Sequence, residues 1–193
     1  MARILATDGL DSGCVEILLK KGHHVDMMHF ERNELLEGAI SGYDVIIIRS
    51  ATKLDSEVLM ANTSRKSRIH LIVRAGVGLD NIDLEKASEL GILVKNTPTA
   101  STKAVVEFTI GHLLTGVRNI SRADRAMRSR VWAKKDSAGT ELSGKNLGLV
   151  GYGRISRGVA VVAKSLGMNV HVFDPFLKDD LTKGSDVVRH ESV

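Results

Sequence analysis

The 193-residue sequence is poor in several features that would define a narrow class of protein. It contains one cysteine, so an intramolecular disulfide framework is excluded, and we expect Cys14 to pack on a helix in a reducing, cytoplasmic setting. No apolar run approaches the ~18–20 residues needed to cross a membrane, and the amino terminus lacks a signal-peptide pattern. We therefore expect a globular protein with no membrane partner.

Aromatic residues are scarce as well. One Trp, two Tyr and four Phe leave few side chains to stack on nucleic-acid bases, and the net charge of +4 is mild. Five arginines nevertheless cluster at uneven spacing: Arg118, Arg122, Arg125, Arg128 and Arg130. Since they do not line one clean helix face, we expect a solvated or subunit-contacting helix and no nucleic-acid partner.

Metal-binding patterns are also missing from the sequence. The seven histidines are scattered, and His23 and His24 form the only adjacent pair. No Cys or His spacing resembles a metal site, so we expect no metal.

Residues 1–97 alternate short apolar runs with amphipathic segments closed by glycine, which is the pattern of βαβ units on a parallel sheet. We expect strands at Ile4–Thr7, Val25–His29, Val45–Arg49, Ile69–Arg74 and Ile92–Lys95. We expect helices at Cys14–Lys21, Asn33–Ile40, Asp55–Ala61 and Leu84–Leu90, with Gly22 and Gly91 as caps. This order predicts a flavodoxin-like α/β domain with helices on both faces of the sheet.

The pattern changes beyond Pro98, and we place a domain boundary near Thr97–Thr99. Ser101–Val117 has the spacing of a long hinge helix, and Ser121–Val131 that of a second, arginine-rich helix. A strand–turn–helix–strand unit follows from about Glu141. Residues 98–193 are therefore expected to hold a hinge helix and the first part of a Rossmann dinucleotide-binding domain, ending just after its second strand.

The turn of this second unit carries the most specific motif. Asn146–Val150 reads as a buried parallel strand, and Gly151 lets the chain reverse where a Cβ would clash. Gly153 lets the backbone approach a pyrophosphate, and the helix Ile155–Leu166 then presents N–H donors at its positive end. Gly167 is the expected cap of that helix. These features predict a dinucleotide site.

The next strand, Asn169–Phe173, delivers Asp174, which lies 23 residues after Gly151. A carboxylate at about 20 residues meets the adenosine ribose hydroxyls and repels a ribose phosphate, so NAD is predicted over NADP. Ser156 stands where a third glycine would allow close packing of helix on strand. Its side chain would cost ~1–3 kcal/mol of overpacking, and we expect weakened NAD binding.

Ligands in open α/β sheets gather beyond the carboxyl ends of the strands. Three loops expected there are rich in polar groups: Arg49–Lys53, Arg74–Gly78 and Asn96–Thr102. The first joins a guanidinium, hydroxyls and an ammonium to exposed N–H groups, and suits a carboxylate or a phosphate. The glycines of the second allow a ligand to meet main-chain N–H groups. Asp83 follows as the expected N-cap of a helix.

Together these loops carry a family resemblance. Residues 49–53, 74–83, 96–98 and 141–155 occur in the order and spacing of the D-isomer-specific 2-hydroxyacid dehydrogenases, which the whole sequence resembles. The resemblance implies that Arg49, Ser50 and the main chain around Gly76 lie near the carboxylate or phosphate of a small anionic 2-hydroxy acid. It implies NAD contacts at Val77, Arg154, Ile155 and Asp174, in addition to the glycines of the turn, Gly151 and Gly153. The hinge helix and the arginine-rich segment with Trp132 would pair subunits into a homodimer or larger assembly.

The resemblance also implies what these 193 residues do not supply. In the family a catalytic Arg, Glu and His come from later segments of the dinucleotide domain, so we assign no catalytic residue and expect this chain alone to be inactive. The implied reaction is oxidation of 3-phosphoglycerate to 3-phosphohydroxypyruvate with NAD. Glyoxylate, hydroxypyruvate or a bulkier 2-hydroxy acid remain alternative substrates. A non-catalytic NAD-binding or dimerising protein is the alternative class.

Overall fold

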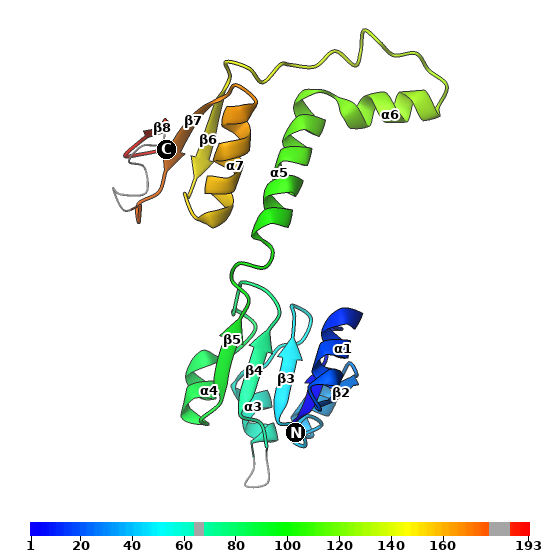
Figure 1. The fold of residues 1–193 in the computed structure, drawn as a ribbon, viewed down its shortest axis with the longest axis vertical. Coiled ribbons are helices and arrows are strands. Elements are labelled where there is room, and N and C mark those ends of the chain that lie inside the picture. Colours follow the sequence, from blue (N-terminus) through cyan, green and yellow to red (C-terminus); the bar gives the residue numbers. More distant parts are fainter. Residues whose placement is uncertain (64–67, 178–185) are drawn as a thin grey trace. The chain divides into compact units, whose positions relative to one another are not determined.

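The computed structural model describes residues 1–63, 68–177 and 186–193. Its internal contacts divide the chain into two compact units, Met1–Ala100 and Ser101–Val193. The boundary expected after residue 97 falls close to this division. Each unit contains its own parallel sheet with helices packed on it (Figure 1).

The first unit is built on a five-stranded sheet in the order β2-β1-β3-β4-β5. All neighbouring strands in it are parallel. The strands are β1 (Arg3–Ala6), β2 (His24–Met27), β3 (Val45–Ile48), β4 (Leu71–Arg74) and β5 (Leu93–Asn96). This is the flavodoxin-like order, so the fold class expected for this half is confirmed.

Four helices connect these strands: α1 (Ser12–Lys20), α2 (Arg32–Leu36), α3 (Ser56–Asn62) and α4 (Leu84–Glu89). Because parallel crossovers are right-handed, the reversal of direction after β2 places α1 on one face and the other three helices on the opposite face. Asp83 caps α4 by accepting the Lys86 N–H, as expected. Gly22 and Gly91 close α1 and α4 with φ of +81° and +70°, which also confirms those caps.

Two expectations for this unit were wrong. Helix α2 ends at Leu36 instead of continuing to Ile40, because Gly38 takes φ +89° and the chain turns. Cys14 is exposed, and α1 has no buried residue, so this thiol does not pack into a core.

The core of the first unit lies between the sheet and α2, α3 and α4. Leu5, Ile46 and Ile72 from three adjacent strands are 0–1% exposed, and they join Leu59 of α3 and Ala87 of α4 in one apolar cluster. Each of these Leu and Ile side chains adds about 1.5–3 kcal/mol by leaving water. The cluster makes the strands a firm base for the loops at their ends.

The second unit contains the helices α5 (Thr102–Val117), α6 (Ile120–Arg128) and α7 (Arg154–Ser165) and the strands β6 (Asn146–Val150), β7 (Asn169–Phe173) and β8 (Val187–Arg189). The sheet order is β6-β7-β8, all parallel. The sequence predicted only two strands here. It missed β8 because three residues with only Val187 partly buried are too short for an apolar-run signal.

Helices α5 and α7 pack closely within this unit. A Cβ added to Gly158 of α7 would lie 2.6 Å from Cγ2 of Val106, so the glycine permits the contact. The sheet contributes Leu147, Leu149, Val170 and Val172 to an apolar cluster that also contains Leu113 of α5 and Ala163 of α7. Strand β6 was expected to be buried, but Val150 is 75% exposed.

No helix in the described ranges is long and apolar enough to cross a bilayer.

Candidate functional site

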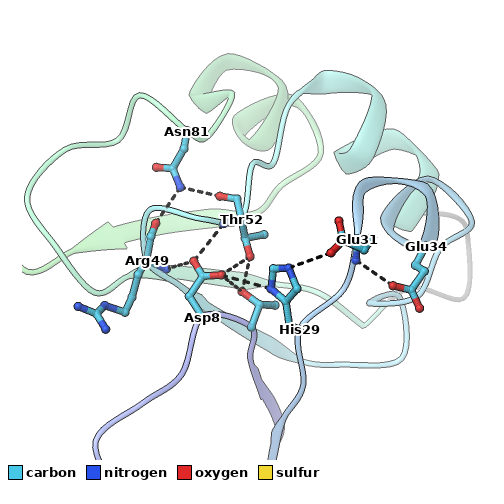
Figure 2. Close-up of polar contacts among 8 residues, drawn as sticks. Asp8, His29, Glu31, Glu34, Arg49, Thr52 and Asn81 are labelled. Carbon is cyan, nitrogen blue, oxygen red and sulfur yellow. Dashed lines mark hydrogen bonds and ion pairs between the residues drawn. The ribbon is translucent and has the colours of Figure 1, made fainter.

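The polar loops of the first unit meet at the carboxyl ends of β1 and β3. These strands are neighbours in the sheet, and the connections run in opposite directions from β1, so this is the switch point where ligands bind in open α/β folds. Figure 2 shows Asp8, which follows β1, directed at Arg49 and Thr52, which follow β3.

Asp8 is the centre of this hydrogen-bonded cluster. Its side chain is only 4% exposed. One oxygen accepts the backbone N–H groups of Arg49 and Thr52, at 2.7 and 3.1 Å. The other accepts the Thr52 hydroxyl at 2.5 Å and the Thr7 hydroxyl at 3.3 Å. Desolvation raises the pKa of Asp8, but the hydrogen bonds from Thr52, Arg49 and Thr7 outweigh it, so the pKa falls below its ordinary value.

A second side chain ties the same loop to the segment after β4. The Asn81 amide donates to the carbonyl oxygens of Arg49 and Thr52, at 2.8 and 2.7 Å (Figure 2). Nearby, Leu54 and Ile82 form a parallel bridge. The Leu54 N–H donates to Asn81 O at 2.8 Å and the Asp83 N–H donates to Leu54 O at 2.9 Å, which joins the two loops again. The loops after β3 and β4 are thus held as one piece.

The loop after β5 is attached to the glycine-rich loop in turn. The Thr97 N–H donates to Gly76 O at 2.9 Å, and the Asn96 amide donates to Val77 O at 2.6 Å. The Arg74 guanidinium lies over Gly76, where a Cβ would come within 1.7 Å of its Nη1. Gly76 is therefore required for this arrangement of the arginine. The buried Nε of Arg74 has no hydrogen-bond partner among the described residues.

The first unit therefore joins the loops that carry Arg49, Ser50, Gly76 and Val77 at one edge of the sheet. Arg49, Ser50 and Val77 are exposed and Gly76 is half-buried. Sequence reasoning missed Asp8 and did not single out Asn81. Ligand-binding residues are expected just beyond the carboxyl ends of parallel strands. This expectation also applies to Asp8, which comes two residues after β1.

The dinucleotide turn lies in the second unit, between β6 and α7. Gly151 has φ +86°, so its glycine is required by backbone conformation. The expected clash is wrong, because an added Cβ would meet no atom within 4 Å. Gly153 is the N-cap of α7 with φ −73°, and it too has open space where a Cβ would be. That space fits the close approach of a pyrophosphate.

Asp174 closes this turn from the end of β7. Its Oδ2 accepts the Tyr152 N–H at 2.7 Å, and its Oδ1 accepts the Phe176 N–H at 2.9 Å. These two backbone N–H groups lower the pKa of the carboxyl. A carboxylate has acceptor positions beyond these two, so Asp174 can still accept ribose hydroxyls.

The other predicted cofactor residues, Arg154 and Ile155, open α7 next to Gly153 and are exposed. Ser156 is half-buried in the same turn. A tight helix contact of α7 lies at Gly158, against Val106 of α5. Within the described ranges, no group of three or more His, Cys, Asp or Glu could hold a metal ion.

Comparison of the sequence with known proteins matches the chain to one family. The family profile described as D-isomer specific 2-hydroxyacid dehydrogenase, catalytic domain, matches residues 4–185. D-3-phosphoglycerate dehydrogenase of Methanocaldococcus jannaschii is 38% identical over 97% of this chain and 35% of its own length. Hydroxypyruvate reductase of Thermotoga maritima is 41% identical over 90% of this chain and 55% of its own length.

Solved structures agree with the sequence matches. NAD⁺-bound 3-phosphoglycerate dehydrogenase of Entamoeba histolytica has a TM-score of 0.74 and 30% identity, over 99% of this chain and 57% of that one. The TT0316 protein of Thermus thermophilus has a TM-score of 0.82 and 30% identity, over 99% and 65%. The chain thus spans about a third to two thirds of the proteins it matches. With the family profile matched over residues 4–185, the chain belongs to the D-isomer-specific 2-hydroxyacid dehydrogenases.

Proposed function

We propose that this chain holds the anionic substrate and begins the cofactor site of an NAD-dependent dehydrogenase that oxidises 3-phosphoglycerate to 3-phosphohydroxypyruvate. The observation that carries the proposal is the Arg49–Lys53 loop at the switch point. Arg49, Ser50 and Lys53 are exposed there, while Asp8 and Asn81 hold the backbone beneath them. A preorganised loop with two cations and a hydroxyl favours a ligand with carboxylate and phosphate groups.

The residues of the second unit suit NAD in their shape and charge. The space over Gly153 accommodates a pyrophosphate at the N-terminus of α7, and Asp174 lies at the end of β7 for the ribose hydroxyls. In the first unit Val77 is exposed beside the substrate loop. When bound, NAD accepts the hydride from the substrate carbon.

Hydroxypyruvate is the second candidate substrate, since the reductase of Thermotoga maritima is 41% identical to this chain. Hydroxypyruvate lacks a phosphate, so only 3-phosphoglycerate offers a phosphate group for Arg49 and Lys53 to bind. Binding of 3-phosphoglycerate and of D-glycerate, which lacks only the phosphate, separates them. We expect calorimetry to show tighter binding of 3-phosphoglycerate, and a loss of this difference in Arg49→Ala. The matched control is Lys20→Ala on exposed α1, which removes the same charge.

Equal affinity of the wild-type chain for the two ligands would contradict the phosphate-bearing substrate. The catalytic Arg, Glu and His of the family are not assigned to any residue here, so we propose that the 193-residue chain binds ligands without turnover. Formation of NADH from 3-phosphoglycerate by this chain would contradict that expectation.

We also propose that α6 and the segment after it pair two copies of the chain. Met127, Val131 and Trp132 are exposed, and a hollow beside α6 is lined by Ala123, Ala126 and Trp132. Exposed apolar side chains beside an apolar hollow are typical of a subunit contact. Sedimentation equilibrium should give a dimer, and Trp132→Ala should shift it toward monomer. A monomeric wild-type chain at high concentration would contradict the pairing.

A further inference from the structure

The side chains of Asp8 and Asn81 form hydrogen bonds with the backbone of the first and last residues of segment 49–52. They form none with the backbone of the two residues between. Asp8 accepts the N–H groups of Arg49 and Thr52, and Asn81 donates to the carbonyl oxygens of the same two residues. The inner residues, Ser50 and Ala51, are exposed, and their backbone N–H groups have no hydrogen-bond partner in the described parts of the chain.

We propose that Asp8 is a positioning residue for the anionic substrate, which fixes the Arg49–Thr52 loop so that the Ser50 and Ala51 amides serve as its main-chain donors. This inference rests on the proposed function, because it assumes that the loop binds the carboxylate or phosphate of the substrate. Amides held in this way need no reordering when an anion binds, which favours affinity.

Asp8 does not act as a ligand or a base in this arrangement. Its carboxylate accepts the Arg49 and Thr52 N–H groups and the Thr52 hydroxyl. The single proton of the Thr7 hydroxyl is shared between Asp8 Oδ1, at 3.3 Å, and Thr52 Oγ1, at 2.7 Å. The side chain is 4% exposed, and the cation nearest to it would be a protonated His29, at 4.0 Å and itself 53% exposed (Figure 2). Its role is therefore to shape the loop.

Charge and positioning predict opposite outcomes when the carboxylate is removed. A negative charge near an anion site weakens anion binding, so Asp8→Asn would tighten binding if charge alone mattered. If Asp8 positions the loop, Asp8→Asn places an amide N–H₂ or a weaker acceptor against the Arg49 and Thr52 N–H groups and weakens binding. The sign of the change in affinity distinguishes the two roles.

The test is calorimetric and NMR titration of the 193-residue chain with 3-phosphoglycerate, well below the thermal midpoint of each variant. We expect Asp8→Asn to weaken binding by about tenfold, the effect of losing one charge-assisted hydrogen bond. In the wild type the Ser50 and Ala51 amide signals should shift on titration, and in the variant these shifts should shrink. The matched control is Asp26→Asn on β2, which removes an aspartate that pairs with Arg3. It should change affinity less than about twofold.

A second pair of variants covers the case in which Asp8→Asn does not fold. Thr52→Val removes the hydroxyl that donates to Asp8, and Thr52→Ser keeps it. We expect the Ser variant to retain most of the affinity and the Val variant to lose it. Unchanged or tighter binding by Asp8→Asn, or equal affinities of the two Thr52 variants, would overturn the inference. Failure of the wild-type chain to bind 3-phosphoglycerate would instead count against the proposed function.

Discussion

At the scale of the residue, the two glycines of the dinucleotide turn have different reasons to be glycine. Gly151 takes φ +86°, where an L side chain is strained. Gly153 has φ −73°, which any residue adopts, and no atom lies within 4 Å of an added Cβ. Neither the backbone conformation nor the packing of the described residues therefore requires glycine at residue 153.

Gly153→Ala should accordingly leave folding almost unchanged and weaken NADH binding by about tenfold or more, because the methyl group occupies the space of the pyrophosphate. Gly148→Ala on β6 is the matched control, since its added Cβ also meets nothing within 4 Å. Thermal unfolding and NADH fluorescence titration give the two readouts. Equal NADH affinity in both variants would show that no phosphate group approaches Gly153.

Sequence could find the residues whose role depends on local spacing. Gly151, Gly153 and Asp174 were located by the strand–turn–helix–strand pattern, and Asp83 by its place before a helix. Sequence could not show that the Asp174 carboxylate accepts the Tyr152 and Phe176 N–H groups. It also could not show that Asp8 supports Arg49, because that contact spans 41 residues of chain.

At the scale of the element, the contact of α5 with α7 depends on one glycine. A Cβ at Gly158 would lie 2.6 Å from Cγ2 of Val106, which is itself buried. We expect Gly158→Ala to destabilise the chain by ~1–3 kcal/mol through overpacking. Shortening the partner in Val106→Ala makes room, so the double variant should be more stable than the two separate losses predict.

Urea denaturation of the single and double variants measures this coupling. Gly116→Ala on α5 is a suitable control, because its added Cβ meets no atom within 4 Å. Additive losses in the double variant would mean that the helices shift apart and absorb the methyl group. The sequence did not single out Gly158, because spacing alone does not show which face of α7 meets α5.

At the scale of the whole molecule, several hydrogen-bonded aspartates make the first unit sensitive to acid. At Asp8 desolvation raises the pKa, but the hydrogen bonds lower it by a larger amount. At Asp44 the main cause of the lowered pKa is the hydrogen bond from the Arg3 N–H. A carboxyl with a lowered folded-state pKa contributes stability above its unfolded pKa of about 3.9, and this is lost as pH falls through the folded value.

We therefore expect the free energy of unfolding of the first unit to be nearly level from about pH 8 to pH 5 and to fall below about pH 4. Urea denaturation followed by circular dichroism at several pH values measures the slope. Asp8→Asn should flatten the slope below pH 4, because one of the responsible groups is gone. An unchanged slope in this variant would show that Asp8 is not among them.

The order of strands and helices in both units was set by local sequence, since apolar runs, N-caps and glycines act on their own neighbours. Two features of these elements were not predicted from the sequence: helix α2 ends early because the chain turns at Gly38, and strand β8 is too short to detect. The sequence alone also located the polar loops at the strand ends and the dinucleotide turn. Which loops touch was decided only by the tertiary structure. Asp8 and Asn81 reach Arg49 across 41 and 32 residues of chain, and such contacts depend on which strands become neighbours in the sheet.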